Sequence, residues 1–94
     1  MAHSVVLTWT DSIDASSTYN VYRSATSGLY TNPPINASPI AAGSTTFTDS
    51  TVTVGTFFYV ATAVLNGSES IHSNEAKAVL LPAAPTALTV SSVS

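Results

Sequence analysis

Short runs of alternating apolar and polar residues, separated by turn residues, extend along most of the chain. Val5, Leu7 and Trp9 alternate with polar or outward positions, and so do Tyr19 and Val21 further on. Alternation of this kind places one set of side chains on a single face of a strand. Further strands are expected at 45–48, 57–65 and 75–80, with a short edge strand within 35–40. Because the strands are spaced regularly and no window has a helical period, the pattern predicts an all-β sandwich or barrel.

Turn residues mark the ends of these strands. Asn66-Gly67 is the dipeptide that favours a two-residue hairpin turn. Pro33-Pro34 excludes a central strand, and the prolines of residues 81–85 predict a linker, because proline lacks an N–H donor and stiffens the backbone. The aromatic residues at inward positions of the expected strands are expected in the core: Trp9, Tyr19, Phe47, Phe57 and Tyr59.

The polar surface of this chain must come mainly from hydroxyl groups, because charged side chains are few. Only 7% of the residues are charged, whereas 15 Ser and 14 Thr make up nearly a third of the 94 residues. Arg23 and Lys77 are the two basic residues and the net charge is −3, which argues against binding to nucleic acid. No apolar run has the roughly 20 residues of a membrane span. The sequence has no cysteine, so disulfides and thiolate chemistry are excluded.

The residue types that carry most enzyme chemistry are few and scattered. His3 and His72 both lie at expected surface positions. Asp11 and Asp14 offer two carboxylates where calcium takes about six to eight oxygen ligands, so a turn held by Asx bonds is the favoured interpretation. The other carboxylates fall in separate stretches, and no serine lies in a nucleophile-elbow context. We therefore expect no catalytic, cofactor-binding or metal site.

Taken in order, these strands resemble a fibronectin type III domain of the kind repeated in bacterial extracellular proteins, and the resemblance covers nearly the whole chain. It implies a two-sheet antiparallel sandwich of immunoglobulin-like topology. The matching segments are Val5-x-Leu7-x-Trp9 for the family's second strand, 19–24 for its third, 47–49 and 54–64 for its fifth and sixth, and 66–70 with 73–75 for the last turn and strand.

Two features depart from the family pattern. The family places a tyrosine at the corner before its sixth strand, whose hydroxyl bonds the upstream backbone, but this position is Phe57. We expect that bond to be missing, or to be made by a neighbour such as Tyr59. The family's first strand has the form Pro-x-x-Leu-x-Val, and here that form follows the last strand, as Pro85-x-x-Leu88-x-Val90. The sequence therefore predicts a first strand displaced to the C-terminus.

This order predicts three parts: residues 1–80 as a module lacking its first strand, 81–85 as a linker, and 86–94 as a first-strand-like segment. A return to the module's own empty position requires roughly 24 Å for a seven-residue strand. Residues 81–86 span at most about 20 Å. Donation to a neighbouring copy is therefore favoured over self-insertion, and a tail left over from a cloning boundary is the third alternative. The residues expected to form the self-association strand are Thr86, Leu88, Val90 and Val93.

The resemblance and the displaced strand together favour a non-catalytic structural module, located outside the cell or on its surface. Its expected partner is itself, in a head-to-tail oligomer or filament, or an adjacent repeat of a larger protein. The alternative is a spacer or carbohydrate-contacting module of a secreted bacterial enzyme or surface protein. Three aromatic residues expected to face outward are the candidate ligand contacts: Tyr22, Tyr30 and Phe58. A hydrolase is the least favoured alternative.

Overall fold

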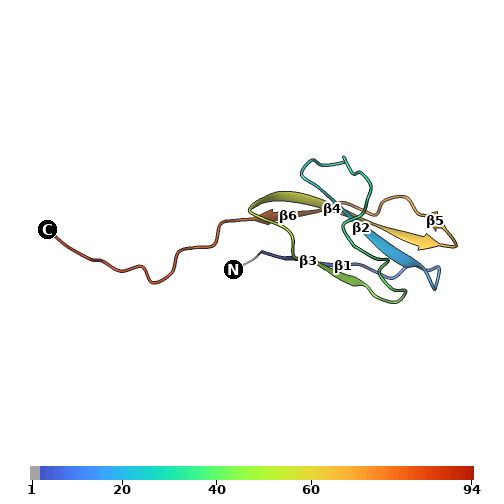
Figure 1. The fold of residues 1–94 in the computed structure, drawn as a ribbon, viewed down its shortest axis with the longest axis horizontal. Helices are drawn as coiled ribbons and strands as arrows, with labels where there is room; N and C mark the ends of the chain where they lie inside the picture. The colour runs from blue at the N-terminus through green and yellow to red at the C-terminus, as the bar shows by residue number, and fades with distance from the viewer. Residues whose placement is uncertain (1–2) are drawn as a thin grey trace.

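The computed structural model describes residues 3–94, and in this range it consists of strands and loops (Figure 1). The strands are β1 (Val5–Thr8), β2 (Thr18–Ser24), β3 (Thr46–Asp49), β4 (Gly55–Leu65), β5 (Ser68–Glu69) and β6 (Ala76–Leu80). The all-β prediction is confirmed. No helix in the described range is long and apolar enough to cross a membrane.

The strands form two antiparallel sheets. β1 pairs with β3 in one sheet, and in the other β4 lies between β2 and the two short strands β5 and β6. Inward side chains of the two sheets meet in one core, whose buried centre is Val21, Val52, Tyr59 and Leu80. The predicted two-sheet antiparallel sandwich is therefore confirmed.

The aromatic residues expected in the core do lie there. Tyr19 and Tyr59 are buried, and the side chains of Trp9, Phe47 and Phe57 pack against the buried centre while remaining partly exposed. Burying a large apolar side chain contributes roughly 1.5–3 kcal/mol. Three of these rings are therefore only partly covered by the rest of the sandwich.

The expected edge strand within residues 35–40 is reduced to a single bridge between Tyr19 and Ile40. Pro34 just before this segment and Pro39 within it lack the N–H donors that a regular ladder requires. The side chain of Asn36 takes the place of a strand, because its Oδ1 accepts the Val21 N–H at 2.8 Å. The Ile35 N–H donates to the Val21 carbonyl, also at 2.8 Å. The backbone groups of Tyr19 and Val21 at the edge of β2 are therefore hydrogen-bonded without a further strand.

The last strand of the second sheet is interrupted. Asn66 and Gly67 have φ values of 52° and 81°, so they form the tight turn that the sequence predicted between β4 and β5. Between β5 and β6, Ser70 and Ser73 follow the edge of β4. Each donates its N–H to a β4 carbonyl at 2.8 Å and accepts a β4 N–H with its hydroxyl at 2.9 Å. Serine side chains therefore replace a stretch of regular ladder.

Residues 81–94, here called the C-terminal tail, extend away from the sandwich (Figure 1). They contain no strand, and Leu88, Val90 and Val93 are 92%, 79% and 89% exposed. The projecting tail makes the described chain 71 Å long but only 25 by 20 Å across. Figure 1 also shows that the tail leaves β6 at the end of the sandwich where β1 begins.

Candidate functional site

One edge of β1 is open. On its other edge β1 pairs with β3, and the Trp9 N–H continues that ladder by donating to the Thr45 carbonyl at 3.0 Å. Hydrogen-bonding groups alternate in direction along an antiparallel strand. The backbone N–H and C=O groups of Val6 and Thr8 therefore point to the open edge, where no strand pairs with β1 among residues 3–94.

A groove of about 380 Å³ lies beside the C-terminal half of this open edge. We call it the β1 groove. Its walls are residues 7–10 of the first sheet and the segment around Ser73 and Asn74 before β6, and its floor includes the core residues Val21, Tyr59 and Ala61. Side chains of the protein's own core thus border an open hollow beside an unpaired strand edge, which is the arrangement that promotes pairing with another strand.

Trp9 closes one end of the β1 groove. Its ring packs against Tyr19 at 5.4 Å between centroids. The indole nitrogen Nε1 is buried, and it is the one buried side-chain polar atom of the described residues that has no hydrogen-bond partner. A buried N–H without an acceptor costs about 1–3 kcal/mol relative to one that is paired. The unpaired Nε1 is therefore an energetic defect of this part of the core.

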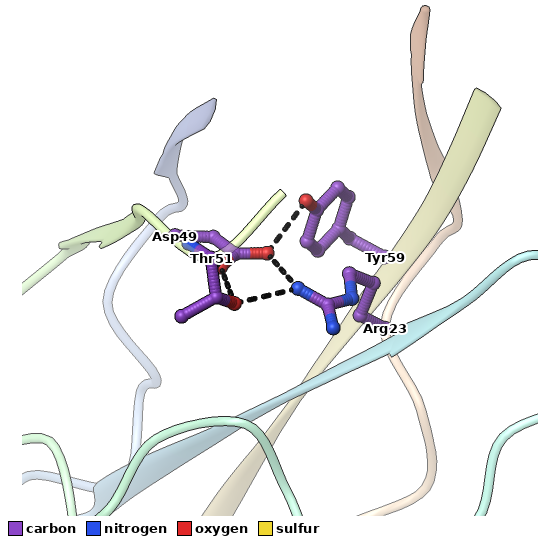
Figure 2. Close-up of polar contacts among 4 residues, drawn as sticks. All are labelled: Arg23, Asp49, Thr51 and Tyr59. Carbon is purple, nitrogen blue, oxygen red and sulfur yellow. Dashed lines mark hydrogen bonds and ion pairs between the residues drawn. The ribbon is translucent and has the colours of Figure 1, made fainter. Parts of the chain in front are cut away.

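A contrasting set of polar side chains lies where β3 ends, between the two sheets (Figure 2). We call Arg23, Asp49, Thr51 and Tyr59 the Asp49 cluster. Oδ2 of Asp49 accepts from the Arg23 guanidinium and from the Tyr59 hydroxyl, both at 2.8 Å. Oδ1 accepts from the backbone N–H and the hydroxyl of Thr51 at 3.1 and 2.8 Å. The carboxylate is 3% exposed and fully paired.

The electrostatics of the Asp49 cluster follow from this pairing. Burial acts to raise the pKa of Asp49, but the hydrogen bonds from Arg23, Thr51 and Tyr59 together outweigh it, so the pKa lies below its ordinary value of 3.8. Burial and the neighbouring carboxylate raise the pKa of Tyr59. Asp49 is therefore a charged group that links the two sheets and is shielded from solvent.

From the sequence, the hydrogen bond of the family's corner tyrosine was expected to be missing or to be made by a neighbour such as Tyr59, and the Asp49 cluster shows which. Phe57 has no hydroxyl, and its ring instead lies under the Arg23 guanidinium at 5.4 Å. Tyr59 makes the upstream bond, to the carboxylate of Asp49 rather than to backbone. Sequence reasoning did not find this cluster, although Arg23 shares the inward phase of Tyr19 and Val21. A charged residue at an inward position is a signal for a buried partner.

The candidate ligand contacts are placed differently from expectation. Tyr22 was expected to face outward but is only 5% exposed, because the hydroxyl is held against Glu69 at 2.5 Å beneath the loop that follows β2. The Tyr30 hydroxyl donates to Glu75 at 2.5 Å. Both tyrosines line a small polar hollow of about 130 Å³ with His72, whereas Phe58, half-buried on β4, does not line it.

The remaining polar residues of interest form turns. The Tyr19 hydroxyl donates to Asp11 and accepts the Ser12 N–H, and Ser12 in turn accepts the Asp14 N–H at 3.1 Å. Within residues 3–94 no three His, Asp or Glu side chains are grouped so that they could hold a metal ion. Among the described residues, the β1 groove is therefore the best candidate binding site, because it combines an unpaired strand edge with a hollow.

The sandwich with this open edge can be compared with known proteins. A crystal structure described as a Fn3-like protein from Clostridium thermocellum is 38% identical in sequence, covering 89% of this chain and 82% of that one, with a TM-score of 0.63. No family model and no curated protein matches the chain. The identity and coverage show that the chain belongs to the fibronectin type III-like family, whose fold is typical of non-catalytic modules.

Proposed function

We propose that this protein is a structural module that joins copies of itself head-to-tail, with the C-terminal tail of one copy inserted as a strand into the β1 groove of the next. The observation that carries the proposal is the β1 groove itself, where an unpaired strand edge lies beside a hollow bordered by core side chains. Adjacent repeats of a longer chain could be joined through the same contact.

The C-terminal tail has the apolar alternation and the free backbone groups that a strand inserted into the β1 groove needs. Leu88 and Val90 alternate on one face of a segment that makes no hydrogen bond to the sandwich in the described range. Insertion would pair the free backbone groups of Val6 and Thr8 and cover apolar surface on both partners. This is β-strand addition, in which the ladder provides affinity and alternate side chains provide specificity.

The direction of the chain favours a second copy as the acceptor. A strand antiparallel to β1 enters the groove at the Trp9 end, because β1 ends there. The tail leaves the sandwich at the opposite end (Figure 1), so self-insertion in this direction requires a return along the whole module. A neighbour meets the tail without that return. The contact is heterologous, so it continues as a filament or closes into a ring.

The location outside the cell remains part of the proposal. It is supported by the hydroxyl-rich, weakly charged composition of the chain. The carbohydrate-contacting alternative is less favoured, because the ring of Tyr22 is buried and the hydroxyls of Tyr22 and Tyr30 are already held by carboxylates.

The test is the mass of the 94-residue chain, measured by light scattering after size exclusion over a range of concentrations. We expect the unmodified chain to form oligomers that grow with concentration. The double variant Leu88→Asp/Val90→Asp, which places charges on the inserted face, should be monomeric. The matched control Thr89→Asp/Ser91→Asp adds the same charge to the outward face and should keep most of the association.

Two results would oppose the proposal. A monomer at every concentration with an unchanged melting transition in both variants would mean that the tail does not pair with the module. A monomer destabilised by Leu88→Asp/Val90→Asp but not by the control would mean that the tail folds back onto its own module.

A further inference from the structure

A second hollow lies beyond the Trp9 end of the β1 groove. Its volume is about 170 Å³, and we call it the Ile71 hollow, because Ile71 lines it and is 90% exposed. We infer, resting on the strand donation proposed above, that this hollow binds residues 82–85 of the donor copy. The proline-rich linker is then part of the interface between two copies and not a free spacer.

The Ile71 hollow continues the β1 groove along the sandwich. From the groove to the hollow, the lining residues advance from 7–10 to 9–12 after the start of β1, and from 59–61 to 61–63 along β4. In the segment before β6 they move from 73–76 back to 70–73. The last two shifts agree in direction, because β6 runs antiparallel to β4. The two hollows therefore form one path, with Trp9 between them.

The chain direction places the donor's linker on this path. A donated strand antiparallel to β1 enters at the Trp9 end, so the donor residues just before that strand pass beside residues 10–12 of the acceptor. With the strand beginning at Thr86, these are residues 82–85. Four linker residues span about 9 Å at 3.1 Å per residue, and residues 9–12 of an extended chain span roughly 10 Å. The linker and the hollow thus have similar lengths.

The backbone of the linker suits a site beyond the end of a strand. β1 ends at Thr8, and residues 10–12 belong to no strand. A regular ladder is therefore not available there to pair the N–H groups of a bound segment, and a buried N–H without a partner costs free energy. Pro82 and Pro85 have no N–H, which removes two of the four donors in residues 82–85.

The side chains of the linker also match the Ile71 hollow. Trp9, Ala61 and Ala63 line the hollow and are partly exposed, and Ile71 beside them is almost fully exposed. Proline-rich segments bind in grooves lined by aromatic rings, because their backbone is already extended and stiff. Residues 82–85 are proline and alanine and are exposed in the free tail. Docking therefore covers apolar surface on both copies.

The experiment uses the full chain carrying Leu88→Asp/Val90→Asp, which keeps both hollows and disables its own tail. Two synthetic peptides serve as probes, one of residues 82–94 and one of residues 86–94 that lacks the linker. Trp9 is the single tryptophan and lines both hollows, so its fluorescence reports binding of either peptide. We expect the shorter peptide to bind about tenfold more weakly, because it covers less apolar surface.

A second substitution in the acceptor tests whether the difference arises in the Ile71 hollow. Ile71→Ser should reduce the difference between the peptides to about threefold or less, and it should leave binding of the shorter peptide unchanged. The exposed position of Ile71 makes loss of folding an unimportant effect. Leu29→Ser is the matched control, because Leu29 is also exposed but lines neither hollow, and it should keep the full difference.

The outcomes separate this inference from the strand donation on which it rests. Equal binding of the two peptides would overturn docking of the linker and leave strand donation in place. A difference that persists in Ile71→Ser would overturn the Ile71 hollow as its site. If neither peptide binds, both the donation and the docking are overturned.

Discussion

Two buried polar groups, the carboxylate of Asp49 and the indole N–H of Trp9, differ in their hydrogen bonding within residues 3–94: the first is paired and the second is not. At the end of β3, Asp49 is buried and every oxygen of its carboxylate is paired within the chain. At the β1 groove, Nε1 of Trp9 is buried and has no partner among the described residues. A folded chain tolerates few unpaired buried groups. The carboxylate of Asp49 is thus satisfied within the chain, whereas the groove side has an unpaired strand edge, which we propose is covered by a strand of another copy.

The strongest test of the completed side is Asp49→Ala. The change leaves the Arg23 guanidinium and the Tyr59 hydroxyl without their shared acceptor. Removing one partner of a buried ion pair is strongly destabilising, so the free energy of unfolding should fall by about 3 kcal/mol. Urea denaturation measures this. The matched control Asp14→Ala, at an exposed position, should change it by less than about 0.5 kcal/mol, and equal losses would contradict the contrast.

On the open side, Val6→Pro removes one backbone N–H that faces the empty edge. Proline is tolerated on an edge strand when its nitrogen faces solvent, so the unfolding free energy of the dilute monomer should change by no more than about 1 kcal/mol. Association should weaken about tenfold or more, because a ladder bond to the inserted strand is lost. Analytical ultracentrifugation measures this change. Val6→Ala keeps the N–H and should associate nearly as well as the unmodified chain.

Tyr59→Phe probes a single hydroxyl of the completed side. The side chain is 2% exposed and its hydroxyl bonds Asp49 at 2.8 Å. Since Asp49 keeps its other donors, the unfolding free energy should fall by about 1 kcal/mol. Tyr30→Phe is the control, because its hydroxyl also bonds a carboxylate, but one that is exposed. A larger loss for Tyr30→Phe would argue that the Asp49 cluster adds little to the stability.

The smallest expected effect is a dependence on pH. The folded pKa of Asp49 lies below its ordinary value of 3.8, so the unfolded chain binds a proton more readily. The stability that this group contributes is present at neutral pH and is lost as the pH falls below about 4 and through the folded pKa. Melting temperatures between pH 6 and pH 2 should therefore fall less steeply in Asp49→Asn than in the unmodified chain. Equal slopes would contradict the lowered pKa.

Much of the fold could be predicted from the sequence, because alternation in β1, β2 and β4 is strong and Asn66-Gly67 allows little besides a tight turn. The edge strand within residues 35–40 was wrong in extent, since a side-chain amide can replace a ladder bond and leaves no periodic signal. The last strand expected at 75–80 is confirmed as β6, but the short strand β5 was not predicted. Serine hydroxyls take over the pairing with β4 between these two strands, and they leave no periodic signal.

The candidate site was less predictable. The Pro85-x-x-Leu88-x-Val90 pattern raised the idea of strand donation, and the structure adds the shape of the groove and the core side chains that border it. Those features depend on which atoms lie across from one another in three dimensions. The partnership of Arg23 with Asp49 was hidden in the same way, although the inward phase of Arg23 was a usable signal.

The most direct measurement is amide hydrogen exchange of Val6 and Thr8, the two residues whose backbone groups face the open edge. If the tail of another copy fills the β1 groove, both amides exchange slowly in concentrated solution and rapidly on dilution. They should also exchange rapidly at every concentration in Leu88→Asp/Val90→Asp. The Leu7 amide, which faces β3, should stay protected throughout. Exchange of Val6 and Thr8 that does not depend on concentration or on the tail variant would contradict strand donation between copies.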